Sequence, residues 1–244
     1  MNEHLIVSLD LSDMEHIKKI VEQLKGLVAF YKIGSIPYTY FGPEIITFLK
    51  GEGYKIMLDL KYHDIPNTVA RACEGAVKMG VDFLTLHTSG GFSMLEDAVK
   101  AVLTSDIKNE EKTKLLGITV LTSIDEAYFK DLFGDVKRNL AEQVVFLAGL
   151  ARSAGLDGVV ASPKEIELIR KDCGRDFLIV TPGIRPRDDK ARADDQARTM
   201  TPKEAIKAGA DYIVVGRPIV KAVNPLEAAE RIIKEMEDGY REIT

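Results

Sequence analysis

The sequence predicts an α/β protein built as a single (β/α)8 TIM barrel that spans residues 1–244. Short runs of Val, Ile and Leu alternate with amphipathic segments along the whole chain, which is typical of a parallel sheet with helical connections. There are eight such runs, and a length of 244 residues is close to the roughly 250 residues of one closed barrel. The sequence indicates no linker and no second domain.

The apolar runs are predicted to be strands, because continuous branched aliphatic residues suit a sheet that is buried on both faces. They are Leu5–Asp10, Ala29–Gly34, Lys55–Lys61, Phe83–Thr88, Leu115–Thr122, Gly158–Ser162, Phe177–Thr181 and Tyr212–Gly216. Helices are predicted between them, among others at Met14–Lys25, Thr68–Lys78, Lys137–Ala154, Lys164–Lys171 and Pro202–Ala208. Most strands end in a polar residue or glycine, and a barrel builds its active site at the carboxyl ends of its strands.

The composition argues against several classes of partner. The net charge is -5 and no block of Lys or Arg stands out, so no nucleic-acid partner is expected. The N-terminus lacks a signal-peptide pattern, and no apolar run approaches the roughly 18 residues of a membrane span, so no membrane partner is expected. Cys73 and Cys173 lie far apart in the sequence without a CxxC motif, which suits a reducing, cytoplasmic location.

Three charged residues, Asp59, Lys61 and Asp64, lie at and just beyond the end of the third strand. A regular strand alternates its faces, so Asp59 and Lys61 are expected to point the same way. Lys32 ends the neighbouring strand and is expected to reach Asp59. The alternating order Lys32, Asp59, Lys61, Asp64 keeps every group ionised. A lysine held as an ammonium is a poor base and nucleophile but a good fixed cation and proton donor to a carbanion; a purely structural ion-pair network is the alternative.

The last two strands predict a phosphate site. Gly216 and Arg217 follow the eighth strand, and Pro218 favours the first turn of a helix, whose free N–H groups bind anions. The loop after the seventh strand carries Arg185, and these two loops form the usual phosphate site of a barrel. We therefore expect Arg185 and Arg217 to bind phosphate oxygens. The segment 183–198 is nearly free of large apolar residues and is either a solvated loop or a lid over the ligand.

The residues near the third strand argue against a metal site. Carboxylates such as Asp59 and Asp64 suit Mg²⁺ together with a phosphosugar, but Lys32 and Lys61 in the same cluster compete with a dication. The four histidines show no zinc spacing. The sequence carries no serine elbow, no P-loop and no dinucleotide fingerprint.

Five segments together resemble the orotidine 5'-phosphate decarboxylase family. The most specific is Asp59-Leu60-Lys61-Tyr62-His63-Asp64-Ile65-Pro66-Asn67-Thr68, which looks like the family signature. The others occur in the family's order: Lys32 within Tyr-Lys-Ile-Gly, Leu121-Thr122-Ser123, Thr181-Pro182-Gly183-Ile184-Arg185-Pro186 and Val215-Gly216-Arg217. The resemblance extends from Asp10 to Arg217, which is nearly the whole chain.

The resemblance implies a homodimeric, metal-free and cofactor-free enzyme of UMP biosynthesis that converts orotidine 5'-monophosphate to uridine 5'-monophosphate and CO2. It implies that Lys61 protonates C6 of the pyrimidine, that Asp59 lies beside the departing carboxylate, and that Lys32 completes the array with Asp64. It also implies that Asp64, Ile65 and Thr68 come from the neighbouring subunit. The remaining substrate contacts implied are Asp10 and Lys32 with the ribose, Thr122 or Ser123 (Thr122 favoured) with the pyrimidine edge, and Arg185, Gln196, Gly216 and Arg217 with the phosphate.

Two other functions stay open. A Mg²⁺-dependent phosphosugar decarboxylase or aldolase, related to 3-keto-gulonate 6-phosphate decarboxylase, shares the core of Asp59, Lys61 and Asp64. Such enzymes carry an acidic residue where Lys32 stands and lack the continuation from Ile65 to Thr68. A phosphoribosyl-ligand sensor on an inactive barrel is the second alternative, and the presence of all four charged residues argues against it.

Overall fold

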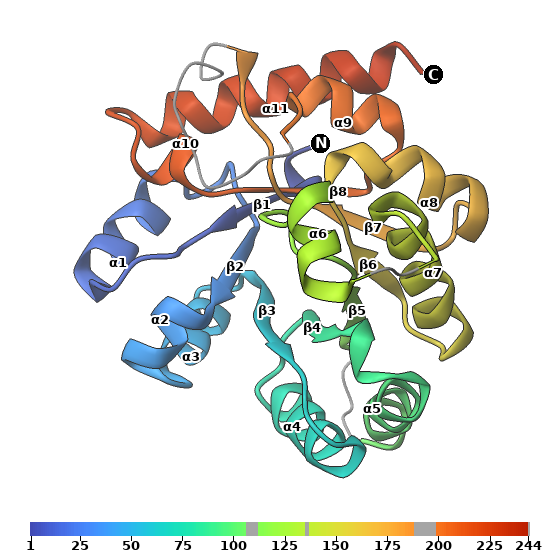
Figure 1. The fold of residues 1–244 in the computed structure, drawn as a ribbon. Helices are drawn as coiled ribbons and strands as arrows, with labels where there is room; N and C mark the ends of the chain where they lie inside the picture. The colour runs from blue at the N-terminus through green and yellow to red at the C-terminus, as the bar shows by residue number, and fades with distance from the viewer. Residues whose placement is uncertain (106–111, 135–136, 188–198, 244) are drawn as a thin grey trace.

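The computed structural model describes residues 1–105, 112–134, 137–187 and 199–243. Within these residues, eight parallel strands close into one barrel in chain order, with β1 paired to β8. The strands are β1 (Leu5–Ser8), β2 (Phe30–Gly34), β3 (Lys55–Tyr62), β4 (Phe83–His87), β5 (Lys114–Ile118), β6 (Gly158–Val160), β7 (Leu178–Thr181) and β8 (Tyr212–Val215). Figure 1 shows them around a common axis with helices outside. The predicted (β/α)8 fold is confirmed.

Helices connect the strands and cover the outside of the barrel (Figure 1). They are α1 (Met14–Gln23), α2 (Ser35–Phe41), α3 (Glu44–Gly51), α4 (Pro66–Lys78), α5 (Phe92–Thr104), α6 (Glu126–Phe133), α7 (Leu140–Ser153), α8 (Ile166–Cys173), α9 (Pro202–Ala208), α10 (Arg217–Val220) and α11 (Pro225–Arg241), with short 3-10 turns η1 (Asn2–His4), η2 (Thr88–Gly90) and η3 (Pro163–Glu165). The five helices predicted by range are present, and Pro202–Ala208 matches at both ends. The predicted start at Lys137 is wrong because Asn139 caps α7 in a capping box with Glu142.

Several predicted strands extend too far toward their carboxyl ends. Ile118 of β5 pairs with Val160 of β6 as the last pair of that ladder, so the predicted continuations to Thr122 and Ser162 are wrong. Ser162 instead accepts a hydrogen bond from the N–H of Lys164 and caps η3. The residues that follow β1, β4 and β8 in the same way are Leu9 and Asp10, Thr88, and Gly216. Apart from the apolar Leu9, these residues therefore belong to the loops and turns at the mouth of the barrel.

The strands bury their side chains in two groups. One group fills the barrel interior and consists of Ile6, Phe30, Met57, Phe83, Leu116, Val180 and Val214. The other lies between barrel and helices and includes the alternate strand residues Tyr31, Leu58 and Leu84. Because both faces of each strand are buried, the sequence shows continuous apolar runs in place of a polar alternation.

Three aspartates join neighbouring strands at the amino end of the barrel. Asp82, Asp157 and Asp211 stand directly before β4, β6 and β8. The Oδ2 atom of each accepts, at 2.7 Å, a backbone N–H of the preceding strand, from Ile56, Leu115 and Ile179 respectively. The N–H of each aspartate donates to the carbonyl oxygen of that same residue, at 2.9, 3.1 and 3.0 Å. Each of these strand pairs is thus held by two hydrogen bonds where it begins.

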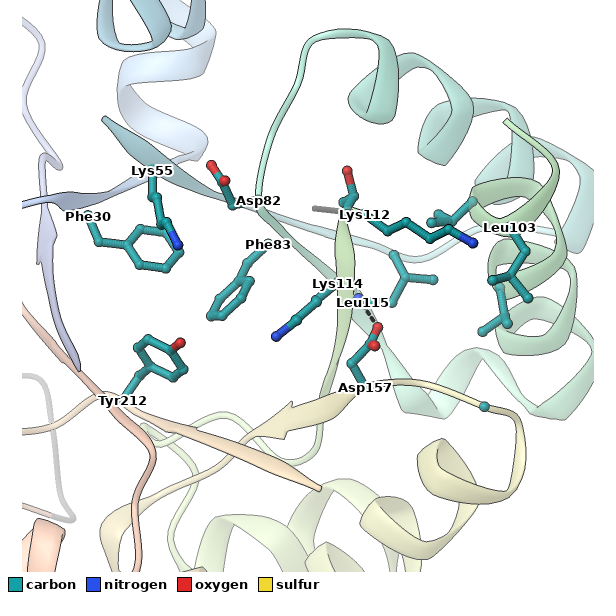
Figure 2. A pocket seen from close by; sticks show the side chains of 14 residues that line it. Phe30, Lys55, Asp82, Phe83, Leu103, Lys112, Lys114, Leu115, Asp157 and Tyr212 are labelled. Atoms are coloured by element: carbon teal, nitrogen blue, oxygen red, sulfur yellow. Dashed lines mark hydrogen bonds between the residues drawn. The ribbon is translucent and has the colours of Figure 1, made fainter. Parts of the chain in front are cut away.

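Phe30, Phe83 and Tyr212 cover the amino end of the barrel axis. Their ring centroids are 4.9, 5.1 and 5.9 Å apart in edge-to-face arrangements. A cavity of about 420 Å³ opens here and is also lined by Lys55 and Lys114 (Figure 2). The rings and the packed interior above them separate this cavity from the carboxyl end of the axis.

Candidate active site

A second cavity, of about 450 Å³, lies at the carboxyl end of the barrel, where the loops after the strands meet. It is lined by eight of the residues singled out from the sequence: Asp10, Lys32, Asp59, Lys61, Thr122, Arg185, Gly216 and Arg217. Between Thr122 and Ser123, only the former lines this cavity. The sequence therefore identified side chains from six different loops and strand ends that share one pocket.

The third strand is irregular where it supplies its charged residues. Leu58 pairs with Leu84 of β4, and the next pair is Tyr62 with Leu86, so residues 59–61 all lie opposite the single residue Thr85. Lys61 has φ +51°, and among the described residues it is the one non-glycine residue with positive φ. The predicted reason for aligning Asp59 with Lys61, a regular alternation of side chains along the strand, is therefore wrong. Their side chains still meet, because the bulge turns Lys61 back toward the pocket.

Four side chains form a continuous chain of alternating charge. Lys32 Nζ lies 3.1 Å from Asp10 Oδ1 and 3.3 Å from Asp59 Oδ2. Lys61 Nζ lies 2.8 Å from the same Asp59 Oδ2. The predicted contact between Lys32 and Asp59 is confirmed. Within one chain, however, the array begins at Asp10 and ends at the ammonium of Lys61.

The surroundings keep these groups ionised. Burial alone would raise the pKa of Asp59, but the ammonium groups of Lys32 and Lys61, with a hydrogen bond from Thr85, outweigh burial and lower it. Burial alone would lower the pKa of Lys32, but the carboxylates of Asp59 and Asp10 outweigh burial and raise it. The pocket thus holds fixed charges of both signs at neutral pH.

Two small residues, Ser8 and Gly34, support the contact between Asp10 and Lys32. Ser8 Oγ donates to Asp10 Oδ2 at 2.6 Å and orients the carboxylate. A Cβ atom at Gly34 would lie 2.7 Å from Asp10 Oδ1 and 3.0 Å from Lys32 Nζ. Sequence reasoning missed both roles, although the glycine two residues after the β2 lysine was a visible signal.

The far side of the pocket is the predicted phosphate site. Gly216 is the N-cap of α10, so the predicted helix start after β8 is confirmed. A Cβ atom at Gly216 would lie 3.3 Å from Ser8 Cβ, so the glycine lets these two loops approach closely. Lys221 lines the pocket next to Arg185 and Arg217 and was not predicted. This side of the pocket is therefore cationic.

Other predicted residues lie away from this pocket. Asp64, Ile65 and Thr68 are exposed at the start of α4, and the side chain of Ile65 is 66% exposed. Asp64 Oδ1 accepts the N–H of Ile65 at 2.6 Å. Within one chain, none of these three residues lines the pocket. Their predicted contribution to the pocket of a neighbouring subunit stays a prediction. Gln196 lies outside the described residues.

Two histidines stand beside the β3 bulge. The rings of His63 and His87 have centroids 5.2 Å apart. Burial lowers the pKa of His87, and the neighbouring His63 and Lys61 lower it further. In the described ranges, no group of three or more His, Cys, Asp and Glu side chains is arranged to hold a metal ion. None of the described helices is long and apolar enough to cross a membrane.

Known proteins resemble the chain over nearly its whole length. Residues 3–232 match the profile of the Orotidine 5'-phosphate decarboxylase / HUMPS family. The chain is 47% identical over 235 residues to orotidine 5'-phosphate decarboxylase of Geotalea daltonii, covering 96% of both chains. It is 47% identical over 237 residues to that of Geobacter metallireducens, covering 97% of both. A crystal structure of orotidine 5'-phosphate decarboxylase from Lactobacillus acidophilus superposes with a TM-score of 0.84 at 39% identity, over 96% of this chain and 99% of the other.

Proposed function

Because the chain belongs to the Orotidine 5'-phosphate decarboxylase / HUMPS family, we propose that it converts orotidine 5'-monophosphate to uridine 5'-monophosphate and CO2. This reaction belongs to pyrimidine biosynthesis. The observation that carries the proposal is the charge chain Asp10–Lys32–Asp59–Lys61 at one side of a pocket whose other side carries Arg185 and Arg217. The proposal covers residues 1–244 as one catalytic domain.

The chemistry explains why a fixed cation is needed. When the bond between C6 and the carboxylate breaks, its electron pair stays on C6 in an orbital that the ring carbonyl groups do not stabilise. Lys61 Nζ, held 2.8 Å from Asp59, is a preorganised positive charge for this carbanion. The ammonium then gives its proton to C6, and CO2 leaves with no further electron acceptor.

Asp59 has two roles in this mechanism. Its lowered pKa keeps it anionic, so it repels the substrate carboxylate in the ground state, and this repulsion ends when CO2 leaves. It also orients the ammonium of Lys61 before the substrate arrives. Lys32 neutralises part of its charge, and its Nζ lies 3.3 Å from the same Asp59 oxygen, Oδ2.

The remaining pocket residues bind the nucleotide. Arg185 and Arg217 suit the phosphate because a guanidinium matches two phosphate oxygens at once. Gly216 is the N-cap of α10 on the same side of the pocket, and Gln196 is assigned to the phosphate by family resemblance. Binding energy from the phosphate, far from C6, then positions the ring against Lys61. The assigned contacts nearer the ring are Asp10 and Lys32 with the ribose and Thr122 with the pyrimidine edge.

We also propose a homodimer in which Asp64, Ile65 and Thr68 enter the neighbouring subunit's pocket. The exposed position of these residues at the start of α4 supports this arrangement, since an exposed Ile65 is suited to contact another surface. Asp64 would then stand beyond Lys61 and extend the alternating charges across the interface. Both cysteines, Cys73 and Cys173, are buried free thiols, which supports a reducing cytoplasm as the location.

One absorbance experiment tests the reaction. Purified protein in excess EDTA is mixed with orotidine 5'-monophosphate, and the ultraviolet absorbance change is followed. We expect full conversion to uridine 5'-monophosphate, with Lys61→Ala protein, purified identically, as the control for contaminating host enzyme. A folded protein that leaves the substrate intact contradicts the proposal. Addition of Mg²⁺ and a keto-sugar phosphate then tests the phosphosugar alternative.

A further inference from the structure

We propose that Thr85 of β4 is a positioning residue that sets the orientation of both Lys61 and Asp59 through a single hydroxyl group. Thr85 does not line the pocket and is fully buried behind it. This inference rests on the proposed decarboxylase function, because Lys61 and Asp59 are the groups placed at the reacting carbon. It assigns a role to a residue that lies within an apolar run of the sequence.

The hydroxyl of Thr85 forms a directed relay between the two residues. Thr85 Oγ1 accepts the backbone N–H of Lys61 at 3.0 Å. The same hydroxyl donates its proton to Asp59 Oδ1 at 2.9 Å. A threonine hydroxyl has one proton to donate, so this pattern uses its donor on the carboxylate and its acceptor on the lysine backbone.

The first contact stabilises an unfavourable backbone conformation. Residues 59–61 of β3 oppose Thr85 alone, so Lys61 lacks a regular ladder partner on β4. Its φ of +51° is one that L residues with side chains rarely adopt. The Thr85 hydroxyl replaces the missing partner of the Lys61 N–H. It thereby holds the conformation that directs the ammonium into the pocket.

The second contact separates the tasks of the two Asp59 oxygens. Oδ1 faces Thr85, whereas Oδ2 faces the ammonium groups of Lys61 and Lys32. Without the hydroxyl, the buried Oδ1 loses its hydrogen bond, and the carboxylate is free to rotate and present both oxygens to the lysines. Such a rotation draws Lys61 Nζ away from the reacting carbon.

Other buried threonines show what an ordinary contact looks like. Thr88 Oγ1 donates to the carbonyl oxygen of Ile118 at 2.7 Å, and Thr113 Oγ1 donates to that of Val81 at 2.7 Å. Thr88 is as fully buried as Thr85 and lies three residues along the same chain segment. It touches no charged pocket residue in these contacts. Thr88→Val is therefore a matched control for the loss of a buried threonine hydroxyl.

Steady-state kinetics of Thr85→Val, Thr85→Ser and Thr88→Val test the proposal. Valine keeps the shape of threonine but removes the hydroxyl. For Thr85→Val we expect kcat to fall by about 100-fold, the effect of a misplacement of roughly 1 Å, with KM changed by less than about 3-fold. Thr85→Ser should recover most of kcat because its hydroxyl is retained, and Thr88→Val should keep wild-type kcat. Wild-type kcat in Thr85→Val, or no recovery in Thr85→Ser, overturns the proposal.

A crystal structure of Thr85→Val gives a second, independent result. We expect Lys61 to leave the positive-φ region or the carboxylate of Asp59 to rotate. The Thr88→Val structure is the reference, and in it we expect both residues to keep their wild-type conformation. An unaltered bulge and carboxylate overturn the proposal whatever the kinetics show. If the wild-type protein itself leaves orotidine 5'-monophosphate intact, the proposed function fails, whereas this structural test of Thr85 still gives an answer.

Discussion

The two ends of the barrel carry the same residue types but bond them differently. At the amino end, Asp82, Asp157 and Asp211 each accept a backbone N–H of the neighbouring strand, and Lys50 and Arg170 add side-chain contacts to Asp82 and Asp211. At the carboxyl end, the contacts found for the carboxylates of Asp10 and Asp59 come from side chains. A backbone N–H is fixed by the sheet, whereas an ammonium group can transfer a proton or turn to a ligand. The first arrangement stabilises the sheet and the second leaves charge available for chemistry.

The cavities at the two ends show that volume does not identify the functional site. The cavity at the amino end is about 420 Å³ and the one at the carboxyl end about 450 Å³. Both contain lysines and aspartates. In Figure 2 the dashed line marks the hydrogen bond that the backbone N–H of Leu115 donates to the carboxylate of Asp157 at the amino end. The partners of the carboxylates therefore distinguish the two ends, and the following predictions test that distinction.

The largest effect is expected for Lys61→Ala at the carboxyl end. Loss of the cation and proton donor should lower kcat by at least about 10⁴-fold, the upper range for a general acid. The absorbance assay measures kcat, and circular dichroism should show an unchanged fold because Lys32 still neutralises Asp59. Wild-type turnover in this variant would contradict the role of Lys61.

Asp211→Ala should act on stability alone. Asp211 Oδ2 accepts the N–H of Ile179 and the guanidinium of Arg170, both at 2.7 Å. Its removal should lower the free energy of unfolding by about 2–3 kcal/mol, typical of hydrogen bonds to a charged group. Denaturant unfolding measures this loss, and kcat should stay at the wild-type value. Asp211→Asn retains an acceptor and should lose less; a large fall in kcat would refute the division between the two ends.

Arg217→Ala should weaken substrate binding. Loss of one charge-assisted contact of about 1.5–3 kcal/mol corresponds to a KM increase of roughly 10- to 100-fold. The kinetic assay should show this increase for orotidine 5'-monophosphate, and equilibrium binding of uridine 5'-monophosphate should weaken in parallel. Unchanged KM and kcat would remove Arg217 from the phosphate site.

Gly34→Ala should disturb the charge chain by steric contact. The new Cβ atom, 2.7 Å from Asp10 Oδ1, should push the carboxylate away from Lys32. We expect kcat/KM to fall by about 10-fold, because a displaced ribose contact misplaces the ring. Gly216→Ala provides a comparison, since its Cβ would meet Ser8 Cβ at 3.3 Å and shift the phosphate side instead. An active Gly34→Ala enzyme with the Asp10 contact intact would show that the loop adapts.

The smallest effect concerns acid pH. The pKa of Asp59 is lowered in the folded state, so its charge stabilises the fold above the unfolded value of about 3.9 and this stabilisation is lost as pH falls through the folded pKa. The raised pKa of Lys32 has the opposite sign, with its contribution complete below about 10.4 and lost as pH rises beyond it. The Tm difference between wild type and Asp59→Asn should therefore shrink below pH 4. A constant difference down to pH 2 would contradict the ionised Asp59.

The sequence predicted the barrel and most of the pocket because both depend on local patterns. Apolar runs located every strand, and the polar residues after them located the mouth. The bulge at residues 59–61 was not predictable, because no glycine or proline marks it and Lys61 adopts positive φ as an ordinary residue. Thr85 was missed because it lies within an apolar run, and its role depends on a neighbouring strand. The alternating order of charges predicted Asp64 beside Lys61, whereas its assignment to the neighbouring subunit came from the resemblance and stays a prediction.

The packed interior of the barrel also determines how small molecules enter and leave the pocket. Ile6, Leu116 and Val180 are fully buried between the two cavities, and the ring of Phe30 lies below them. Among the described residues, these packed side chains fill the barrel axis behind the pocket. We therefore expect CO2 formed in the pocket to leave through the opening by which the nucleotide enters. The release of CO2 and the release of the nucleotide then use the same opening. The architecture of the barrel therefore determines the order in which the two products leave.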